Sequence, residues 1–369
     1  MNKEILHLHN YKCFSDQNLV INNLTVLVGS NGAGKSTTIQ SLLLLHSSLK
    51  EKNSILDLDG IFGLDLGTGA SVVNMNSNDD TISFSLSSNN NPENKIECKY
   101  KADIIKEKLN LDITDIIIND DSFSILKDEF YYLSAERRGP RVSQPLVSMK
   151  FLSVGIEGEN TAQVIAHDSG RTKVDQKRIF IDSENPNLEY QVNAWLSHIL
   201  PGVKVTASMD TKTLTAQLRI GNIFTISDTV VATNFGFGVS YFLPVIVECL
   251  VAKENSMLII ENPEAHLHPA AQTAIGVFLA RMAFSGLRIV LETHSDHVIS
   301  GIQRFVVEQR GWHDHVTINN FGINQDDNSP LITPIEFDEN GNFSTWPDGF
   351  MDQNQKDYIE LCKVRDNEI

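Results

Sequence analysis

The segment "GSNGAGKST", residues 29–37, constrains the fold more than any other part of this 369-residue chain. It matches the pattern G-x-x-x-x-G-K-[ST] through Gly29, Gly34, Lys35 and Ser36. The apolar run "LTVLVG" leads into it, and "STTIQSLLLL" follows with apolar residues at helical spacing. A strand, a glycine loop and a helix in that order predict a phosphate-binding loop, in which backbone N–H groups and the helix N-terminus surround the phosphates.

The residue types in this loop fit a nucleotide that carries a magnesium ion. Lys35 would reach the β- and γ-phosphates, and the hydroxyl of Ser36 would bind Mg²⁺. We therefore expect ATP and Mg²⁺ as ligands. The expected nucleotide-binding residues of the loop are Asn31, Gly32, Ala33, Gly34, Lys35, Ser36 and Thr37.

Two further apolar runs end in residues that suit nucleotide chemistry. "MLIIE" ends at Glu261, which would lie beside the phosphate-binding loop and hold Mg²⁺ directly or through water. Glu264 lies two residues beyond Asn262. The second run, "LRIVLETHS", leads to His294, which would reach a γ-phosphate oxygen or the attacking water. A histidine held in the core by hydrogen bonds is the alternative.

A glycine-rich segment, "TNFGFGV", comes before the acid strand. Gly236 and Gly238 stand at the start of a predicted helix, whose N-terminus would be available to a phosphate. In isolation these residues describe only a helix that begins with two small residues. His266 and His268, further along, form an H-x-H pair, for which we weigh a zinc site against a role at an interface.

The net charge of −17 argues against a protein that coats nucleic acid through electrostatics alone. A local basic track remains in "ERRGPR", where Arg137, Arg138 and Arg141 would bind nucleotide, nucleic acid, a partner subunit or acidic residues of the chain itself. Widely spaced cysteines indicate free thiols in a reducing compartment. No apolar run is long enough to cross a bilayer, and the first residues lack an apolar signal core. We therefore expect a cytoplasmic protein without membrane contact.

The order of the apolar patterns predicts an α/β protein in which the two ends of the chain build one head. We expect residues 1–50 to form its N-terminal part, with the phosphate-binding loop, and residues 226–320 its C-terminal part. Residues 51–128 are predicted as a β-rich insertion and residues 129–225 as a middle α+β segment. Residues 321–369 would form a small appendage, with a short hairpin around "DENGN" and a terminal helix. The run "NLVINNLTVLVGS" is interpreted as one buried strand.

The order of these motifs resembles that of the ABC and SMC-like ATPase heads. More closely, "YKCF", "GSNGAGKST", "ENPEAHLHP" and "ETHSDH" are similar to the prokaryotic RecF/OLD-like AAA ATPases. The closing "WPDGFMDQ" is similar to the C-terminal segment of their DUF3696-type subgroup, found in anti-phage defence systems such as Septu-like, retron-linked and PARIS-like ones. The resemblance implies an ABC/SMC-like P-loop ATPase head with a β-rich insertion and a small C-terminal appendage.

The resemblance also implies a homodimer, or a higher homo-oligomer, in which heads pair head-to-tail around ATP. A signature from the partner, here Asn234, Gly236, Gly238 and Ser240, would then cap the nucleotide. This signature departs from the Leu-Ser-Gly-Gly of transporters, which disfavours a transporter motor. Lys12, within "NYKCF", matches a basic position near the nucleotide in related heads.

In ABC-type heads the acid directly after the metal ligand is the general base, and Asn262 occupies that position here. An amide cannot take up a proton. We therefore expect slow hydrolysis, with Glu264 as the catalytic base, Glu261 as the acid beside the metal and His294 as polar support. The alternative is a nucleotide-gated scaffold with negligible hydrolysis.

The resemblance further implies a sensor or regulatory subunit that controls an effector. The sequence after His294 shows no fused nuclease motif, so we expect the effector to be a separately encoded protein such as a nuclease. The alternative is a RecF-like DNA-repair clamp, in which nucleic acid would bind the local arginine tracks.

Overall fold

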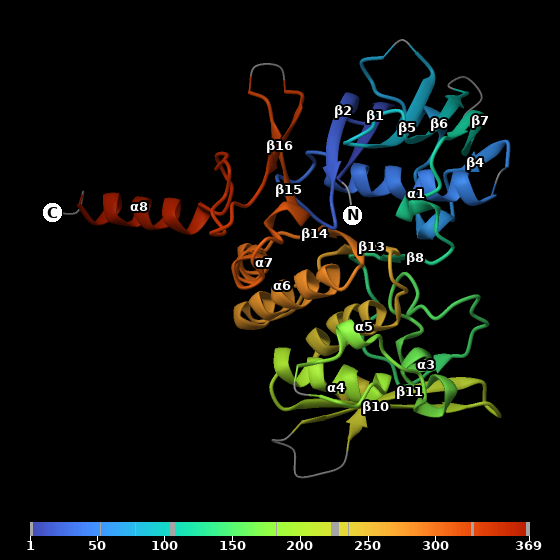
Figure 1. Ribbon diagram of the computed structural model, residues 1–369, viewed down its shortest axis with the longest axis vertical. Coiled ribbons are helices and arrows are strands. Elements are labelled where there is room, and N and C mark those ends of the chain that lie inside the picture. The colour runs from blue at the N-terminus through green and yellow to red at the C-terminus, as the bar shows by residue number, and fades with distance from the viewer. Residues whose placement is uncertain are drawn as a thin grey trace.

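A six-stranded sheet forms the centre of the molecule, as the computed structural model in Figure 1 shows. The structure describes residues 3–51, 53–77, 79–103, 108–181, 183–222, 229–234, 236–325 and 328–366. The strand order is β16 (Pro330–Ile335), β15 (Val316–Ile323), β3 (Leu24–Gly29), β14 (Arg288–Glu292), β13 (Met257–Glu261) and β8 (Phe130–Leu133). All neighbours are parallel except the β15–β16 hairpin.

Helices cover both faces of this sheet. On one face lies α1 (Lys35–Glu51), and on the other lie α5 (Phe237–Val251), α6 (Pro269–Phe284) and α7 (Asp296–Glu308). Parallel strands covered on both faces are expected to be apolar throughout, which explains the unbroken runs in β3, β13 and β14. Successive side chains alternate between the faces: Leu27 and Val290 pack on the α1 side, whereas Val26, Ile289 and Leu291 pack on the opposite side.

The two helices that follow β13 and β14 cross at very short range. A Cβ atom on Gly276 of α6 would lie 2.1 Å from the carbonyl oxygen of Val298 in α7. Likewise, a Cβ atom on Gly301 of α7 would lie 2.1 Å from the carbonyl oxygen of Thr273 in α6. The absence of side chains at these two positions therefore sets the distance between the helices.

A second, antiparallel sheet covers the outer side of α1. Its order is β2 (Phe14–Ile21), β1 (Glu4–Tyr11), β5 (Thr81–Ser88), β6 (Lys95–Ala102), β7 (Asn110–Ile118) and β4 (Ile55–Asp57). The short helices η1 (Ile61–Gly63), α2 (Gly69–Val72) and η2 (Ser124–Leu126) accompany it. The prediction of one strand through "NLVINNLTVLVGS" was wrong: the chain turns at Asn22 and Asn23, and β2 and β3 belong to different sheets.

A third sheet lies beside α4 (Leu188–Ile199) and joins β10 (Val203–Asp210), β11 (Thr215–Asn222), β12 (Val230–Val231) and β9 (Gln144–Pro145). The same part of the chain holds α3 (Thr161–Ile165), η3 (His167–Gly170), η4 (Gln176–Arg178) and η5 (Ala232–Asn234). Trp195 of α4 packs edge-to-face against Phe278 of α6, which joins this part to the helices of the central sheet.

The C-terminal part begins with η6 (His313–His315), continues through β15 and β16, and ends in α8 (Gln353–Asp366). The hairpin predicted around "DENGN" is reduced to a single antiparallel bridge between Phe337 and Phe343. Figure 1 shows α8 projecting away from the body of the molecule. Within the described residues, none of the helices combines the length and the apolar character needed to cross a bilayer. The mixed α/β architecture expected from the sequence is observed, whereas the boundaries between the predicted segments remain a prediction.

Candidate functional site

The glycine loop between β3 and α1 needs glycine for steric reasons. Gly29, Gly32 and Gly34 have φ values of 117°, 77° and 110°, in the left-handed region that glycine tolerates best. A Cβ atom on Gly29 would lie 2.0 Å from the carbonyl oxygen of Phe321, and one on Gly34 would lie 2.3 Å from Cζ of Phe14. The loop is therefore fitted closely between β15 and the start of β2.

The side chains of this loop are arranged at the N-terminus of α1. Nζ of Lys35 donates to the carbonyl oxygens of Gly29 at 2.8 Å and Ser30 at 2.9 Å, and the residue is 4% exposed. Ser36 is exposed and its hydroxyl is available to a ligand, as are the exposed residues Asn31 and Gly32. Ala33 is buried, and Thr37 contacts Sγ of Cys13.

A cavity of about 750 Å³ lies beside the glycine loop. Gly32 and Ala33 line it on one side, and Lys12 and Asn74 line it on another. Nζ of Lys12, the basic residue singled out by the resemblance, donates to Oε1 of Gln40 in α1 at 2.6 Å. Ligand pockets in proteins measure roughly 300–1,000 Å³, so this cavity has room for a nucleoside.

Three carboxylates gather at the carboxyl edge of the central sheet: Glu261, Glu264 and Glu292. Glu261 and Glu292 are paired across β13 and β14, and Glu292 is paired with Leu27 across β14 and β3. Burial and then the charge of Glu261 raise the pKa of Glu292 to about 7, against the opposing effect of Lys35. Burial also raises the pKa of Glu261 above its usual value.

The hydrogen bonds of these carboxylates differ. Oε1 of Glu261 accepts from the hydroxyl of Tyr132 at 2.8 Å, and Oε2 accepts from the backbone N–H of Ala135 at 3.3 Å. In the part of the chain that the structure describes, the buried Oε2 atoms of Glu264 and Glu292 have no hydrogen-bond partner. Buried carboxylate oxygens without partners are costly, so these two atoms are suited to accept a bond from a ligand, a cation or water.

Glu264 and His294, predicted as base and support, lie next to each other. Oε1 of Glu264 accepts a hydrogen bond from the backbone N–H of His294 at 2.8 Å. Burial and the charge of Lys35 lower the pKa of His294, so the imidazole is neutral near pH 7. Glu264 opposes this shift without outweighing it. The pair thus combines a carboxylate oxygen free of hydrogen bonds with a neutral ring.

The buried side chain of Arg137 supports the backbone of Glu261 and Asn262. Its guanidinium group is 3% exposed and donates to the carbonyl oxygens of Glu261 and Asn262. Asn262 has a φ of 43°, and its N–H donates to the carbonyl oxygen of Glu292 at 2.9 Å. Burial lowers the pKa of Arg137 to about 10. This arginine therefore fixes the geometry of the acid loop from inside the protein.

The other two arginines of the basic track lie outside this core. Arg138 forms an ion pair with Glu157 at 2.6 Å, and Arg141 is exposed.

The glycine signature is placed apart from the glycine loop of the same chain. Gly236 begins α5, Gly238 lies against the backbone of His266, and Asn234 is exposed in η5. The central sheet separates α5 from α1, and the residues lining the cavity beside the loop do not include the signature. Within the described residues, the buried hydroxyl of Ser240 has no hydrogen-bond partner. One chain therefore does not bring the predicted signature and the glycine loop together.

The two histidines of the H-x-H pair have local contacts. Nδ1 of His268 accepts from the N–H of Ala270 and caps α6, and the ring of His266 packs against Tyr241. The described residues contain no group of three or more His, Cys, Asp or Glu side chains arranged to hold a metal ion. The phosphates of a bound nucleotide would supply the further ligands that a magnesium ion needs at this site.

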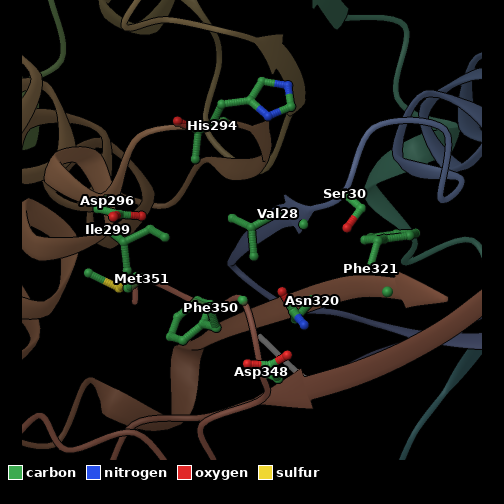
Figure 2. Close-up of a pocket in the computed structure, with 14 residues that line it drawn as sticks. Val28, Ser30, His294, Asp296, Ile299, Asn320, Phe321, Asp348, Phe350 and Met351 are labelled. Atoms are coloured by element: carbon green, nitrogen blue, oxygen red, sulfur yellow. The ribbon is translucent and has the colours of Figure 1, made fainter. Parts of the chain in front are cut away.

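A smaller pocket, of about 260 Å³, lies on the other side of the glycine loop (Figure 2). Ser30, His294 and Asp296 line it together with Asn320 of β15. Asp348 and the residues up to Met351 close it, so the C-terminal segment reaches the same edge of the sheet as the loop. Figure 2 shows the ring of His294 pointing away from the C-terminal residues.

Sequence reasoning missed Glu292 and Tyr132 and left the role of Arg137 open. A signal for Glu292 was present, because Val290 and Glu292 have the same parity in the strand "RIVLE" and therefore share the α1 face. Tyr132 and Arg137 had no comparable signal, since their contacts with the acid loop come from residues more than 120 positions away.

The glycine loop after β3 and the neighbouring parallel strands that lead to Glu261 and His294 are the features of a nucleotide-binding P-loop ATPase head. The chain belongs to the AAA domain family whose description names the AbiEii toxin and type IV toxin–antitoxin systems; the match spans residues 24–300. Residues 320–361 match a second family, described as a protein of unknown function (DUF3696). No curated protein matches the sequence.

Solved structures of Smc head domains are similar in fold. One, bound to the C-winged helix domain of ScpA, is 10% identical with a TM-score of 0.53, and the match covers 91% of this chain and 98% of that chain. Another, with an extended coiled coil and bound to the C-terminal domain of ScpA derived from Pyrococcus furiosus, is 10% identical with a TM-score of 0.53. That match covers 99% of each chain. These matches confirm the predicted ABC/SMC-like head.

Proposed function

We propose that this protein binds ATP with Mg²⁺, pairs head-to-tail with a second copy and hydrolyses ATP slowly. The observation that carries the proposal is the meeting of Lys35, Glu261, Glu264 and His294 at the carboxyl edge of adjacent parallel strands. In open parallel sheets, ligands bind at this edge.

Ser36 and Glu261 would hold the magnesium ion, which neutralises charge on the β- and γ-phosphates when it is bound. Lys35 would exchange its bonds to Gly29 and Ser30 for bonds to phosphate oxygens. Glu264, with its free oxygen, would take the proton of the attacking water, and His294 would support the γ-phosphate side. Because Asn262 cannot act as a base, the chemistry depends on Glu264 alone, which favours a low turnover.

The separation of the signature from the glycine loop supports a composite site made by two chains. The N-terminus of α5, with Gly236, Gly238 and Ser240, would complete the nucleotide site of the other copy. This surface is formed by the start of α5 together with the segments that contain Gly139 and His266. Gly139 packs against Phe237 of α5, and Gly238 of α5 packs against His266.

The experiment compares ATP turnover of the wild type with that of Glu264→Gln and Glu261→Gln, and measures the oligomeric state with and without ATP. We expect measurable turnover in the wild type, strong loss in both variants, and dimers that form with ATP. Equal inactivity of all three proteins would contradict hydrolysis and leave the nucleotide-gated scaffold, which the amide at Asn262 favours.

We further propose that the protein is a cytoplasmic sensor subunit of an anti-phage defence complex, with a separately encoded nuclease as effector. A family description that names toxin–antitoxin systems supports a role in controlling a toxic partner. Co-purification with the product of the neighbouring gene, with and without ATP, tests this role. A neighbour that neither binds nor changes its activity with the nucleotide state would count against it.

A RecF-like clamp is the weaker candidate. Of the basic track, Arg137 is buried and Arg138 is paired with Glu157, which leaves little free positive charge there for a DNA backbone.

A further inference from the structure

We propose that Glu292 is a ligand of the magnesium ion that accompanies ATP, in the inner position beside Ser36, with Glu261 in the outer position. The inference rests on the proposed function, because it assigns a residue within that ATP site.

The alternation of side chains along β14 places the Glu292 side chain on the face of the sheet where the nucleotide would bind. Val290 packs on the α1 face, while Ile289 and Leu291 pack on the opposite face. Side chains alternate along a strand, so Glu292 lies on the α1 face, where the glycine loop presents Lys35 and Ser36. Glu292 is paired in register with Leu27 of β3, two residues before Gly29 at the start of the glycine loop.

The strand order puts Glu292 nearer to the glycine loop than Glu261. The loop follows β3, β14 is the direct neighbour of β3, and β13 lies one strand further away. Neighbouring strands are about 4.8 Å apart, so Glu261 starts roughly twice as far from β3 as Glu292 does. Magnesium binds oxygen ligands at only about 2.1 Å, which makes this difference decisive for direct contact.

The hydrogen bonds favour the same assignment. Both carboxylate oxygens of Glu261 already accept hydrogen bonds, from Tyr132 and Ala135. Glu292 is 5% exposed, and its buried Oε2 atom has no hydrogen-bond partner among the described residues. A buried carboxylate oxygen that is unpartnered and faces a phosphate-binding loop is suited to a cation.

The charged groups around Glu292 also favour a bound cation. The charges of Glu261 and Glu264 act unfavourably on Glu292. Lys35 is the cation that offsets them, and its ammonium group is bound to the carbonyl oxygens of Gly29 and Ser30. A divalent ion next to Glu292 would offset the repulsion among the carboxylates.

The test uses the full chain, a non-hydrolysable ATP analogue and Mn²⁺ as the probe. Free Mn²⁺ is followed by electron paramagnetic resonance during a titration, and binding of the analogue alone is measured in EDTA. We expect Glu292→Gln to weaken Mn²⁺ binding roughly 10- to 100-fold while binding of the analogue in EDTA is unchanged. Glu261→Gln should weaken Mn²⁺ binding less, and Glu308→Gln, which removes an exposed carboxylate of α7, should leave it unchanged.

The inference would be overturned if Glu292→Gln bound Mn²⁺ with wild-type affinity. It would also be overturned if this variant lost affinity for the analogue equally in the presence of Mn²⁺ and in EDTA. The second measurement needs no variant: a structure of the wild type with the analogue and Mn²⁺, located by its anomalous scattering. If this structure shows no oxygen of Glu292 in the coordination shell of Mn²⁺, the inference is overturned even if the variant fails to fold. Failure of the wild type to bind the analogue would instead overturn the proposed function, and this inference with it.

Discussion

The backbone N–H of His294 donates to Oε1 of Glu264 at 2.8 Å, which joins the residues that follow two neighbouring strands of the central sheet. Because glutamine keeps a carbonyl oxygen at this position, Glu264→Gln preserves the bond but removes the carboxylate that we propose as the base. We expect turnover to fall about 100-fold, in the range of general-base catalysis, with ATP affinity little changed. Steady-state hydrolysis and equilibrium ATP binding measure the two effects separately. A variant that keeps most of its turnover would exclude Glu264 as the base.

Arg137 supports the acid loop from the interior, so its loss should reduce both stability and turnover. Arg137→Met removes the guanidinium donors to the carbonyl oxygens of Glu261 and Asn262, of which Asn262 keeps a bond from the N–H of Ala265 at 3.3 Å. We expect a loss of about 2–4 kcal/mol in the free energy of unfolding, measured by urea denaturation.

The matched control is Arg138→Met, which breaks an exposed ion pair with Glu157 and should cost less than about 1 kcal/mol. Equal losses in the two arginine variants would show that Arg137 has no special role beneath the acid loop.

The crossing of α6 and α7 predicts strong sensitivity to a single methyl group. Gly301→Ala would place a Cβ atom 2.1 Å from the carbonyl oxygen of Thr273, so the helices must move apart. We expect a destabilisation of about 1–3 kcal/mol in thermal or chemical unfolding. Gly322→Ala is the control, because the nearest atom to its Cβ would be at an ordinary 3.8 Å. Tolerance of Gly301→Ala would mean that the helix pair adjusts freely.

Glu248 in α5 predicts a pH-dependent stability. It is 1% exposed, and burial raises its pKa to about 8 from an ordinary value of 4.5. The folded protein keeps a proton that the unfolded chain releases. The stability from this neutral carboxyl is therefore complete below about pH 4.5 and is lost as the pH rises through about 8. Glu248→Gln cannot ionise, so its free energy of unfolding relative to the wild type should rise by about 3 kcal/mol between pH 6 and pH 9.

Denaturation at several pH values measures this difference, and Glu360→Gln in exposed α8 controls for the loss of one negative charge. A constant difference between Glu248→Gln and the wild type across this range would contradict the expected ionisation.

The elements with continuous apolar runs could be predicted from the sequence with accurate ends. The strand expected at "MLIIE" coincides with β13, because burial on both faces of the sheet makes the whole strand apolar. The division between β2 and β3 was not predictable in this way. Asn22 and Asn23 are buried and hydrogen-bonded at the turn, so the local polarity that normally marks a surface turn is missing.

The site shows the same division. Lys35, Glu264 and His294 follow apolar strands that the sequence predicts, and the structure places Glu264 beside His294. Arg137 and Tyr132 reach Glu261 and Asn262 through tertiary contacts between distant parts of the chain, which no local pattern encodes. The alternation of side chains along the strand was sufficient to predict that Glu292 faces the site. The functional role was assigned to a residue after the strand instead.

The C-terminal segment gives α8 the geometry of a lever arm. Lys356, in its first turn, pairs with Asp348 at 2.6 Å and with Asp352 at 3.0 Å, so the base of the helix is tied to the wall of the pocket that contains His294. With 14 residues, α8 is about 21 Å long, and a rotation of about 10° at its base displaces its far end by about 4 Å. A displacement too small to disturb the core beside His294 therefore becomes a movement of several ångströms at the tip, which projects from the body of the molecule (Figure 1).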